Sequence, residues 1–150
     1  MPQSYVSIYT HFVFSTKHRR PIIAEEMQAR LFEYIGGIVR SERGKLIAAG
    51  GMPDHVHLLV SVPKEKSTSE TMRDVKTNSS AWVHNTFDSL ADFAWQAGYG
   101  AFSVGYSNLD IVKRYIANQK RHHRNRTFQE EFVEFLHRYD IEYDEKYLWE

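Results

Sequence analysis

The sequence contains no cysteine among its 150 residues. Disulfides and thiolate metal sites are therefore excluded, and any bound metal must use histidine, carboxylate, amide or water ligands. The absence is also typical of a reducing cytoplasm. The chain has no apolar run of about 18 residues, the length that spans a bilayer, and its first residues lack the charged and apolar regions of a signal peptide. We therefore expect a cytoplasmic protein with no membrane partner.

The sequence also lacks net charge, because 19 basic residues balance 19 acidic ones. The charges are nevertheless segregated along the chain. Residues 113–126 contain lysines and arginines but no acidic residue, residues 17–20 form a second basic cluster, and acidic residues dominate from Thr127 onward. A polyanion responds to local charge, since salt screens charges beyond about 10 Å. The basic stretches therefore favour nucleic acid, whereas we expect the acidic end to be a solvated helix and tail.

The length and composition fit one globular domain over residues 1–150. The chain is 42% hydrophobic and 25% charged, as in ordinary folded proteins, and it shows no internal repeat or low-complexity stretch. Residues 5–15 alternate in polarity, which predicts a strand. Ser67 with Glu70, and Thr127 with Glu130, form capping boxes that predict helix starts.

The expected elements follow one another as strand, helix, strand, strand, helix, strand and two helices. They are residues 5–15, 24–42, 45–49, 55–62, a helix from 68, extended segments within 93–104, and helices at 108–123 and from 127. This order predicts an α+β protein with a ferredoxin-like (RRM-like) split βαβ fold. We expect a four-stranded antiparallel sheet with its first and third strands central, and added C-terminal helices. The pair Gly36–Gly37 within the first helix suggests close backbone packing there.

Two histidines stand at the start of the third expected strand. His55 and His57 lie one residue apart, so their side chains point to the same face of the sheet, while Val56 and Leu58 point to the other. Co-facial imidazoles are half of a metal site. If the first strand is adjacent, Tyr9 and His11 share this open face, which leaves His11 either beside the pair or without a role.

The third helix supplies further polar groups. Tyr115 and Gln119 are four residues apart and so lie on one helix face, next to a stripe of apolar residues. A tyrosine can attack the phosphorus of a phosphodiester, but a pKa near 10 leaves little phenolate at pH 7. A divalent cation polarises the phosphoryl oxygen and orients the phosphate. Two imidazoles and the Gln119 carbonyl oxygen would hold such a cation with positions left for substrate.

These motifs resemble a known family. The segments Met-Pro-Asp-His-Val-His-Leu-Leu (52–59), Gly-Tyr-Gly-Ala-Phe-Ser-Val (98–104) and Tyr-Ile-Ala-Asn-Gln (115–119), with His122–His123, look like those of the single-tyrosine transposases of the HUH-endonuclease superfamily, insertion-sequence 200/605 type. The similarity extends over nearly the whole chain. It implies DNA transposition, a form of DNA recombination, by cleavage and rejoining of single-stranded DNA at hairpin-bearing element ends.

The resemblance also implies residue roles and partners. His55, His57 and Gln119 would be metal ligands, and Tyr115 would be the catalytic nucleophile that leaves a 5′-phosphotyrosine and a free 3′-hydroxyl. The family metal is usually Mg²⁺ or Mn²⁺, although two imidazoles by themselves equally suit zinc. The resemblance implies a homodimer, often with the tyrosine helix of one subunit completing the other's site. It implies no nucleotide cofactor.

Ten further residues are candidates for DNA contact because they are basic and flank the expected site. They are Lys17, Arg19, Arg20, Arg73, Lys76, Lys113, Arg114, Lys120, Arg121 and His122. His122 and His123 could contact phosphate or steer the tyrosine helix, but an exposed helix end is the simpler interpretation.

Other functions stay open at this point. A non-catalytic ferredoxin-like nucleic-acid-binding module, with Tyr5 and Tyr9 stacking on bases, explains the fold and the basic stretches. It gives no reason for His-x-His and Tyr-x-x-x-Gln to occur together. A domesticated relative that acts on repeated palindromes would carry the same motifs as a mobile element's enzyme. A metal-binding regulator without catalysis is the third alternative.

Overall fold

The computed structural model describes residues 3–149. The elements are β1 (Tyr9–Ser15), η1 (Lys17–Arg19), α1 (Glu25–Ser41), β2 (Lys45–Met52), β3 (His55–Ser61), α2 (Thr68–Thr86), η2 (Asp88–Leu90), β4 (Gly100–Val104), η3 (Tyr106–Asn108), α3 (Leu109–Ala117), α4 (Gln119–His122) and α5 (Phe128–Arg138). Residues 1–2 and 150 of the expected domain 1–150 lie outside the described residues, and the extent of the domain stays a prediction.

The sheet has the order β2-β3-β1-β4, and all neighbouring strands are antiparallel. The first and third strands are thus adjacent and central, which confirms the predicted split βαβ arrangement. In the β1–β3 register, His11 pairs with Leu59 and Val13 with His57. Because partners across a ladder point to the same face, His11, His55 and His57 all project from one side of the sheet.

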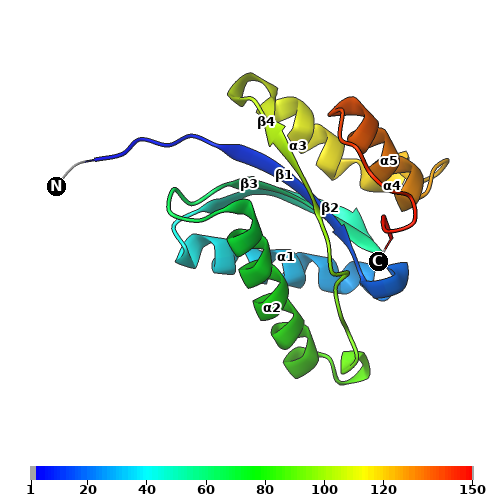
Figure 1. Cartoon of the computed structure of the whole chain (residues 1–150). Coiled ribbons are helices and arrows are strands. Elements are labelled where there is room, and N and C mark those ends of the chain that lie inside the picture. The colour runs from blue at the N-terminus through cyan, green and yellow to red at the C-terminus, as the bar shows by residue number, and fades with distance from the viewer. Residues whose placement is uncertain (1–2, 150) are drawn as a thin grey trace.

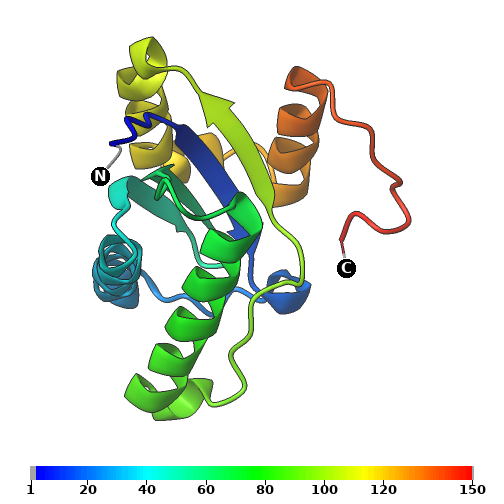
Figure 2. The same ribbon diagram turned by 60° about the vertical axis from the view of Figure 1, so that its left-hand side comes forward.

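The two faces of the sheet are covered by different helices (Figure 1). Phe12, Phe14 and Leu58 pack with α1 and α2 into the larger hydrophobic core. The opposite face is covered by α3, α4 and α5, where Val13 and Phe102 meet the aromatic side chains of α5. In the view of Figure 2, α3 lies to the left of β4 and α5 to its right, and the C-terminal segment runs beyond α5. The face that carries the histidines is therefore closed by the three C-terminal helices.

Four expected elements differ from the structure. β2 extends to Met52 instead of ending at Ala49. β1 begins at Tyr9 rather than at residue 5, and residues 3–8 form an exposed arm that projects from the body (Figure 1), where Ile8 O accepts a hydrogen bond from Val62 N. Only Gly100–Val104 of the 93–104 segment forms a strand of the sheet. The third helix is interrupted at Asn118, whose φ of −103° and ψ of 28° separate α3 from α4. The capping boxes of α2 and α5 are present as predicted.

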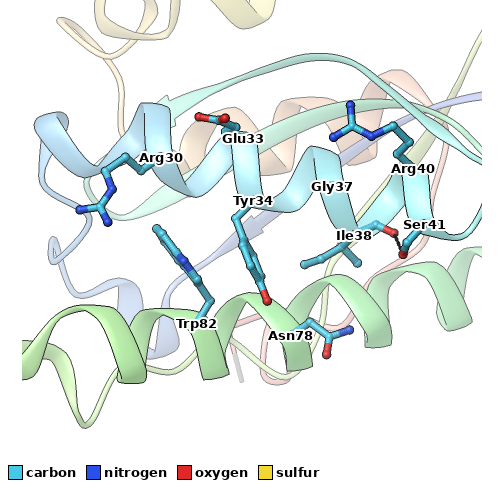
Figure 3. Close-up of a pocket in the computed structure, with 9 residues that line it drawn as sticks. All are labelled: Arg30, Glu33, Tyr34, Gly37, Ile38, Arg40, Ser41, Asn78 and Trp82. Carbon is cyan, nitrogen blue, oxygen red and sulfur yellow. Dashed lines mark hydrogen bonds between the residues drawn. The ribbon is translucent and has the colours of Figure 1, made fainter.

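A cavity of about 650 Å³ lies between α1 and α2, on the side of the sheet away from the histidines. Figure 3 shows Tyr34 of α1 stacked on Trp82 of α2, with ring centroids 5.1 Å apart, and Arg30 beside the indole. The two helices are thus joined by aromatic packing near the surface. No helix within residues 3–149 is both long and apolar enough to cross a membrane.

The expectation of close packing at Gly36–Gly37 is wrong. A Cβ at Gly36 would meet Leu46 at 3.5 Å and one at Gly37 would meet Arg40 at 3.9 Å, both ordinary contacts. Close packing occurs instead at Gly50 of β2, where a Cβ would overlap the backbone oxygen of Ile116 in α3. The absence of a side chain at Gly50 therefore lets α3 lie against the sheet.

Replacing Gly50 with alanine should push α3 away from β2, because backbone atoms cannot give way as a flexible side chain can. We expect a loss of about 1–3 kcal/mol in the free energy of unfolding, measured by urea denaturation. Gly98→Ala is the matched control, since its Cβ would meet only Gln96, at 3.9 Å. Equal stability of the two variants would contradict this role for Gly50.

Candidate active site

Three histidines direct their Nε2 atoms toward one point beneath α4 and α5. His55 and His57 come from β3, and His123 follows α4. The Nδ1 atom of each ring forms a hydrogen bond on the side away from this point. The Nδ1 of His55 lies 2.7 Å from Asp54 Oδ1, and that of His57 lies 2.8 Å from His11 Nε2. The Nδ1 of His123 lies 2.9 Å from a backbone oxygen. Such outer contacts fix ring orientation in metal-binding histidines. His11 therefore lies beside the pair, as one of the two sequence interpretations held.

The carboxylate of Glu131, on α5, completes the cluster. Its side chain is fully buried, and Oε1 lies 3.4 Å from Nε2 of His55, 3.0 Å from that of His57 and 3.0 Å from that of His123. The four ligand atoms lie within 4.8 Å of one another. Three imidazoles and one carboxylate are a donor set that suits a divalent cation.

Gln119 points into the same cluster. Its side chain is buried, and Oε1 lies 3.2 Å from His55 Nε2 and 3.1 Å from His123 Nε2. The amide group contacts the second carboxylate oxygen of Glu131 at 3.4 Å. The carbonyl oxygen of Gln119 is therefore a further oxygen donor next to the histidine nitrogens.

The Tyr115 hydroxyl lies on the opposite side of the Glu131 carboxylate from the histidines. It donates a hydrogen bond to Glu131 Oε2 and accepts one from Arg126 Nη2 at 2.8 Å. The phenol ring stacks on His122, with centroids 4.4 Å apart and an interplanar angle of 24°. In this structure the tyrosine and the histidines that it approaches belong to the same chain.

Burial and hydrogen bonds together set the protonation of the cluster. Burial and the negative charge of Glu131 raise the pKa of Tyr115, so the resting side chain is a neutral phenol. Burial would also raise the pKa of Glu131, but hydrogen bonds from His123, His55 and His57 outweigh it and hold that pKa far below its usual value. For His55, burial is outweighed by hydrogen bonds to Asp54 and Glu131, which raise its pKa to about 9.

Two of the other histidines, His57 and His11, are held neutral. Burial lowers the pKa of His57 to about 4, with repulsion from His55 and His123 acting in the same direction. Burial and the charge of His57 lower the pKa of His11 to about 3. Charged His55 is thus paired with the buried carboxylate of Glu131, whereas His57 beside it is neutral.

These shifts predict that the metal-free protein is most stable near pH 6.5, the ordinary pKa of histidine. Below that pH, His11 and His57 bind protons in the unfolded chain but not in the folded protein. The free energy of unfolding therefore falls by about 1.4 kcal/mol per pH unit for each of these protons. Above it, the stability contributed by charged His55 is lost as the pH rises toward 9. Urea unfolding midpoints from pH 5 to 9 in chelator test this, and a pH-independent midpoint would contradict it.

The basic residues expected to contact DNA lie in different settings. Several form contacts within the chain: Arg20 pairs with Asp92 at 3.1 Å, Lys120 pairs with Glu25, and Lys76 donates to the backbone oxygens of residues 96, 97 and 98. Arg19 lies over the ring of Trp149. Lys17, Arg73, Lys113, Arg114 and Arg121 are exposed, whereas His122 packs on Tyr115. Their role in DNA contact stays a prediction.

Sequence reasoning missed Glu131, His123 and Arg126. Glu131 was expected in a solvated acidic segment, yet it is fully buried, so that expectation is wrong for this residue. A signal existed, because Glu131 lies three residues after Phe128 and four before Phe135, within the apolar stripe of α5. A carboxylate in such a stripe requires a buried partner. The exposed helix end expected at His123 is also wrong, since its side chain is only 6% exposed.

Comparison with known proteins identifies a family. The family model described as "Transposase IS200 like" matches residues 4–119. The transposases for insertion sequence element IS200 of Salmonella typhimurium (strain LT2) and Salmonella typhi are each 27% identical over 115 residues, covering 73% of this chain and 74% of the relative. The ISDra2 transposase TnpA of Deinococcus radiodurans is 22% identical over 114 residues, covering 73% of this chain and 81% of that protein.

Two solved structures share the fold. A crystal structure assigned as a transposase from Deinococcus radiodurans R1 has a TM-score of 0.63 and 23% identity, covering 79% of this chain and 96% of that one. The REP-associated tyrosine transposase bound to a REP hairpin has a TM-score of 0.57 and 17% identity, covering 79% and 70%. With the family match spanning most of the sequence, including both strand histidines, Tyr115 and Gln119, the chain belongs to the IS200-like transposase family, a class of DNA-cleaving enzymes.

Proposed function

We propose that this chain cleaves and rejoins single-stranded DNA at hairpin-bearing element ends through a 5′-phosphotyrosine intermediate on Tyr115. The observation that carries the proposal is the position of the Tyr115 hydroxyl, which is hydrogen-bonded to the carboxylate that also faces three histidines. A tyrosine in a buried packing role needs no such cluster beside its oxygen. The family membership supplies the substrate class, since transposases act on DNA.

The chemistry follows from the contacts of the hydroxyl. The Tyr115 oxygen forms a bond to phosphorus and its proton is released to water, while Glu131 Oε2 orients the hydroxyl through the hydrogen bond that it accepts. The bond from phosphorus to the 3′-oxygen breaks, and that oxygen takes up a proton from water and leaves as a hydroxyl. Rejoining reverses these transfers with another 3′-hydroxyl. The phosphotyrosine bond retains the energy of the cleaved bond, so no nucleotide cofactor is needed.

The ligands of a metal ion would be the Nε2 atoms of His55, His57 and His123 with Glu131 Oε1, and the Gln119 carbonyl oxygen lies next to them. A bound divalent ion, Mg²⁺ or Mn²⁺, would polarise the phosphoryl oxygen and offset its developing charge. The nitrogen-rich donor set favours Mn²⁺ over Mg²⁺, because imidazole suits transition metals.

The partners proposed for the chain are hairpin-bearing single-stranded DNA and a second copy in a homodimer. A relative with the same fold is described as bound to a REP hairpin, which supports hairpin DNA as the substrate. The exposed lysines and arginines of η1, α2, α3 and α4 are available to contact its phosphates. A cytoplasmic location stays a prediction.

The proposal is tested by incubating the protein with labelled hairpin-bearing single-stranded DNA and Mn²⁺ or Mg²⁺, followed by a denaturing gel. We expect a protein–DNA adduct and a released strand with a 3′-hydroxyl. Binding of the hairpin without an adduct would support the nucleic-acid-binding module instead. The DNA flanking the gene distinguishes a mobile element's enzyme from a domesticated relative that acts on repeated palindromes.

A further inference from the structure

The histidine–carboxylate cluster is closed to solvent on most sides. His55, His57 and Glu131 have no exposed surface, whereas Tyr115 is partly exposed, so a DNA phosphate can approach the cluster only from its edges. A cavity of about 350 Å³ adjoins the cluster at His123 and Arg126, where the β2–β3 turn faces the start of α5. It is lined further by Pro53, Asp54, Phe128 and Gln129.

Arg126 joins this cavity to the nucleophile. It lines the cavity, and its Nη2 donates to the Tyr115 hydroxyl oxygen at 2.8 Å and lies 3.7 Å from Glu131 Oε2. Its backbone oxygen lies 2.9 Å from His123 Nδ1, so the same residue also fixes a histidine of the cluster. Arg126 therefore contacts the reacting oxygen and also lines the cavity, which Tyr115 itself does not line.

We propose that this cavity receives the DNA backbone next to the scissile phosphate and that Arg126 is a catalytic residue, which binds a non-bridging phosphate oxygen and stabilises the negative charge on the Tyr115 oxygen. This role rests on the DNA cleavage proposed for Tyr115. A guanidinium carries its charge at every working pH and presents several donors in one plane, so it can contact both oxygens at once. The family match ends at residue 119 and so does not assign Arg126.

The charges around the cavity are compatible with a phosphate. The second terminal nitrogen of Arg126 pairs with Glu134, whose side chain is half-exposed, so exchanging that carboxylate for a phosphate oxygen costs little. Asp54 is the acidic residue of the lining, but its carboxylate is hydrogen-bonded to His55 at 2.7 Å. The first turn of α5 also borders the cavity, and the partial positive charge of a helix start favours an anion.

The first test compares single-turnover adduct formation in Arg126→Gln, Arg126→Lys and the control Arg124→Gln, which alters an exposed arginine of the same basic stretch. We expect Arg126→Gln to slow the reaction by about 10²-fold or more, as loss of an oxyanion-stabilising donor does. Arg126→Lys should retain part of the rate and Arg124→Gln nearly all of it. A rate in Arg126→Gln within about twofold of the control would overturn the proposal.

The second test separates charge stabilisation from a purely structural effect. Incorporating 3,5-difluorotyrosine at position 115 lowers the pKa of the phenol, so its oxygen carries negative charge more readily and depends less on a neighbouring cation. We expect difluorotyrosine to accelerate adduct formation more in Arg126→Gln than in the otherwise wild-type protein. Equal effects in both backgrounds would overturn the assignment of Arg126 to the tyrosine oxygen.

The third test does not require cleavage. The ¹⁹F resonances of difluorotyrosine at position 115 are followed while a single-stranded oligonucleotide is added. We expect a shift in the otherwise wild-type protein and a much smaller one in Arg126→Gln. The same shift in both would overturn phosphate binding at Arg126. A wild-type shift without any adduct supports the cavity as the phosphate site and contradicts only the proposed cleavage.

Discussion

Replacing Tyr115 with phenylalanine is expected to abolish the covalent protein–DNA adduct. The substitution removes the hydroxyl oxygen of Tyr115, which is hydrogen-bonded to Glu131, and leaves the ring that stacks on His122. Losing a nucleophile typically lowers the rate of the chemical step by more than about 10³-fold. The measurement is the adduct formed in a single turnover with hairpin-bearing DNA, resolved on a denaturing gel.

The control for this substitution is Tyr106→Phe, which removes a hydroxyl from an exposed tyrosine shortly before α3. It should form the adduct at the wild-type rate. DNA affinity should change little in Tyr115→Phe, because the phosphate-binding side chains remain. An adduct that persists in Tyr115→Phe would show that another residue is the nucleophile.

Replacing Glu131 with glutamine should have the second largest effect. The variant keeps the volume of the side chain but removes the charge that three histidines and the Tyr115 hydroxyl share. Charged His55 loses a buried counter-ion, which costs about 3 kcal/mol in the free energy of unfolding of the metal-free protein. We also expect affinity for Mn²⁺ to fall at least about tenfold and adduct formation at least about 10²-fold.

The matched control is Glu130→Gln, one residue earlier on α5. Glu130 is exposed and serves the capping box, a role that glutamine also fills. Its metal affinity, measured by titration calorimetry, and its adduct formation should remain close to wild type. If Glu131→Gln bound Mn²⁺ as tightly as this control does, Glu131 would not be a ligand.

Much of the fold was predictable from local patterns. Alternating polarity in β1 and β3 and two capping boxes placed the strands and helix starts, and the order of elements then determined the sheet. The pair His55 and His57 was predictable for the same reason, since a strand period of two fixes a common face. Tyr115 and Gln119 followed from helical spacing and from the resemblance to the transposase family.

The rest of the site depends on tertiary packing that no local pattern specifies. Glu131 and Arg126 reach Tyr115 because α5 turns back over the histidine face after the break that follows α4. His123 enters the cluster because the helix is interrupted at Asn118 and ends again after His122. The acidic composition around Glu131 hid its burial, since most neighbours in that segment are solvated.

The central claim is that Tyr115 becomes covalently linked to DNA at the histidine–carboxylate cluster. The most direct measurement is mass spectrometry of the adduct after digestion with protease and nuclease. We expect the peptide that contains Tyr115 to carry the mass of a 5′-phosphorylated nucleotide, attached through the phenolic oxygen. The account would be contradicted by an unmodified Tyr115 peptide in a reaction that has cut the strand, or by a nucleotide linked to any other residue.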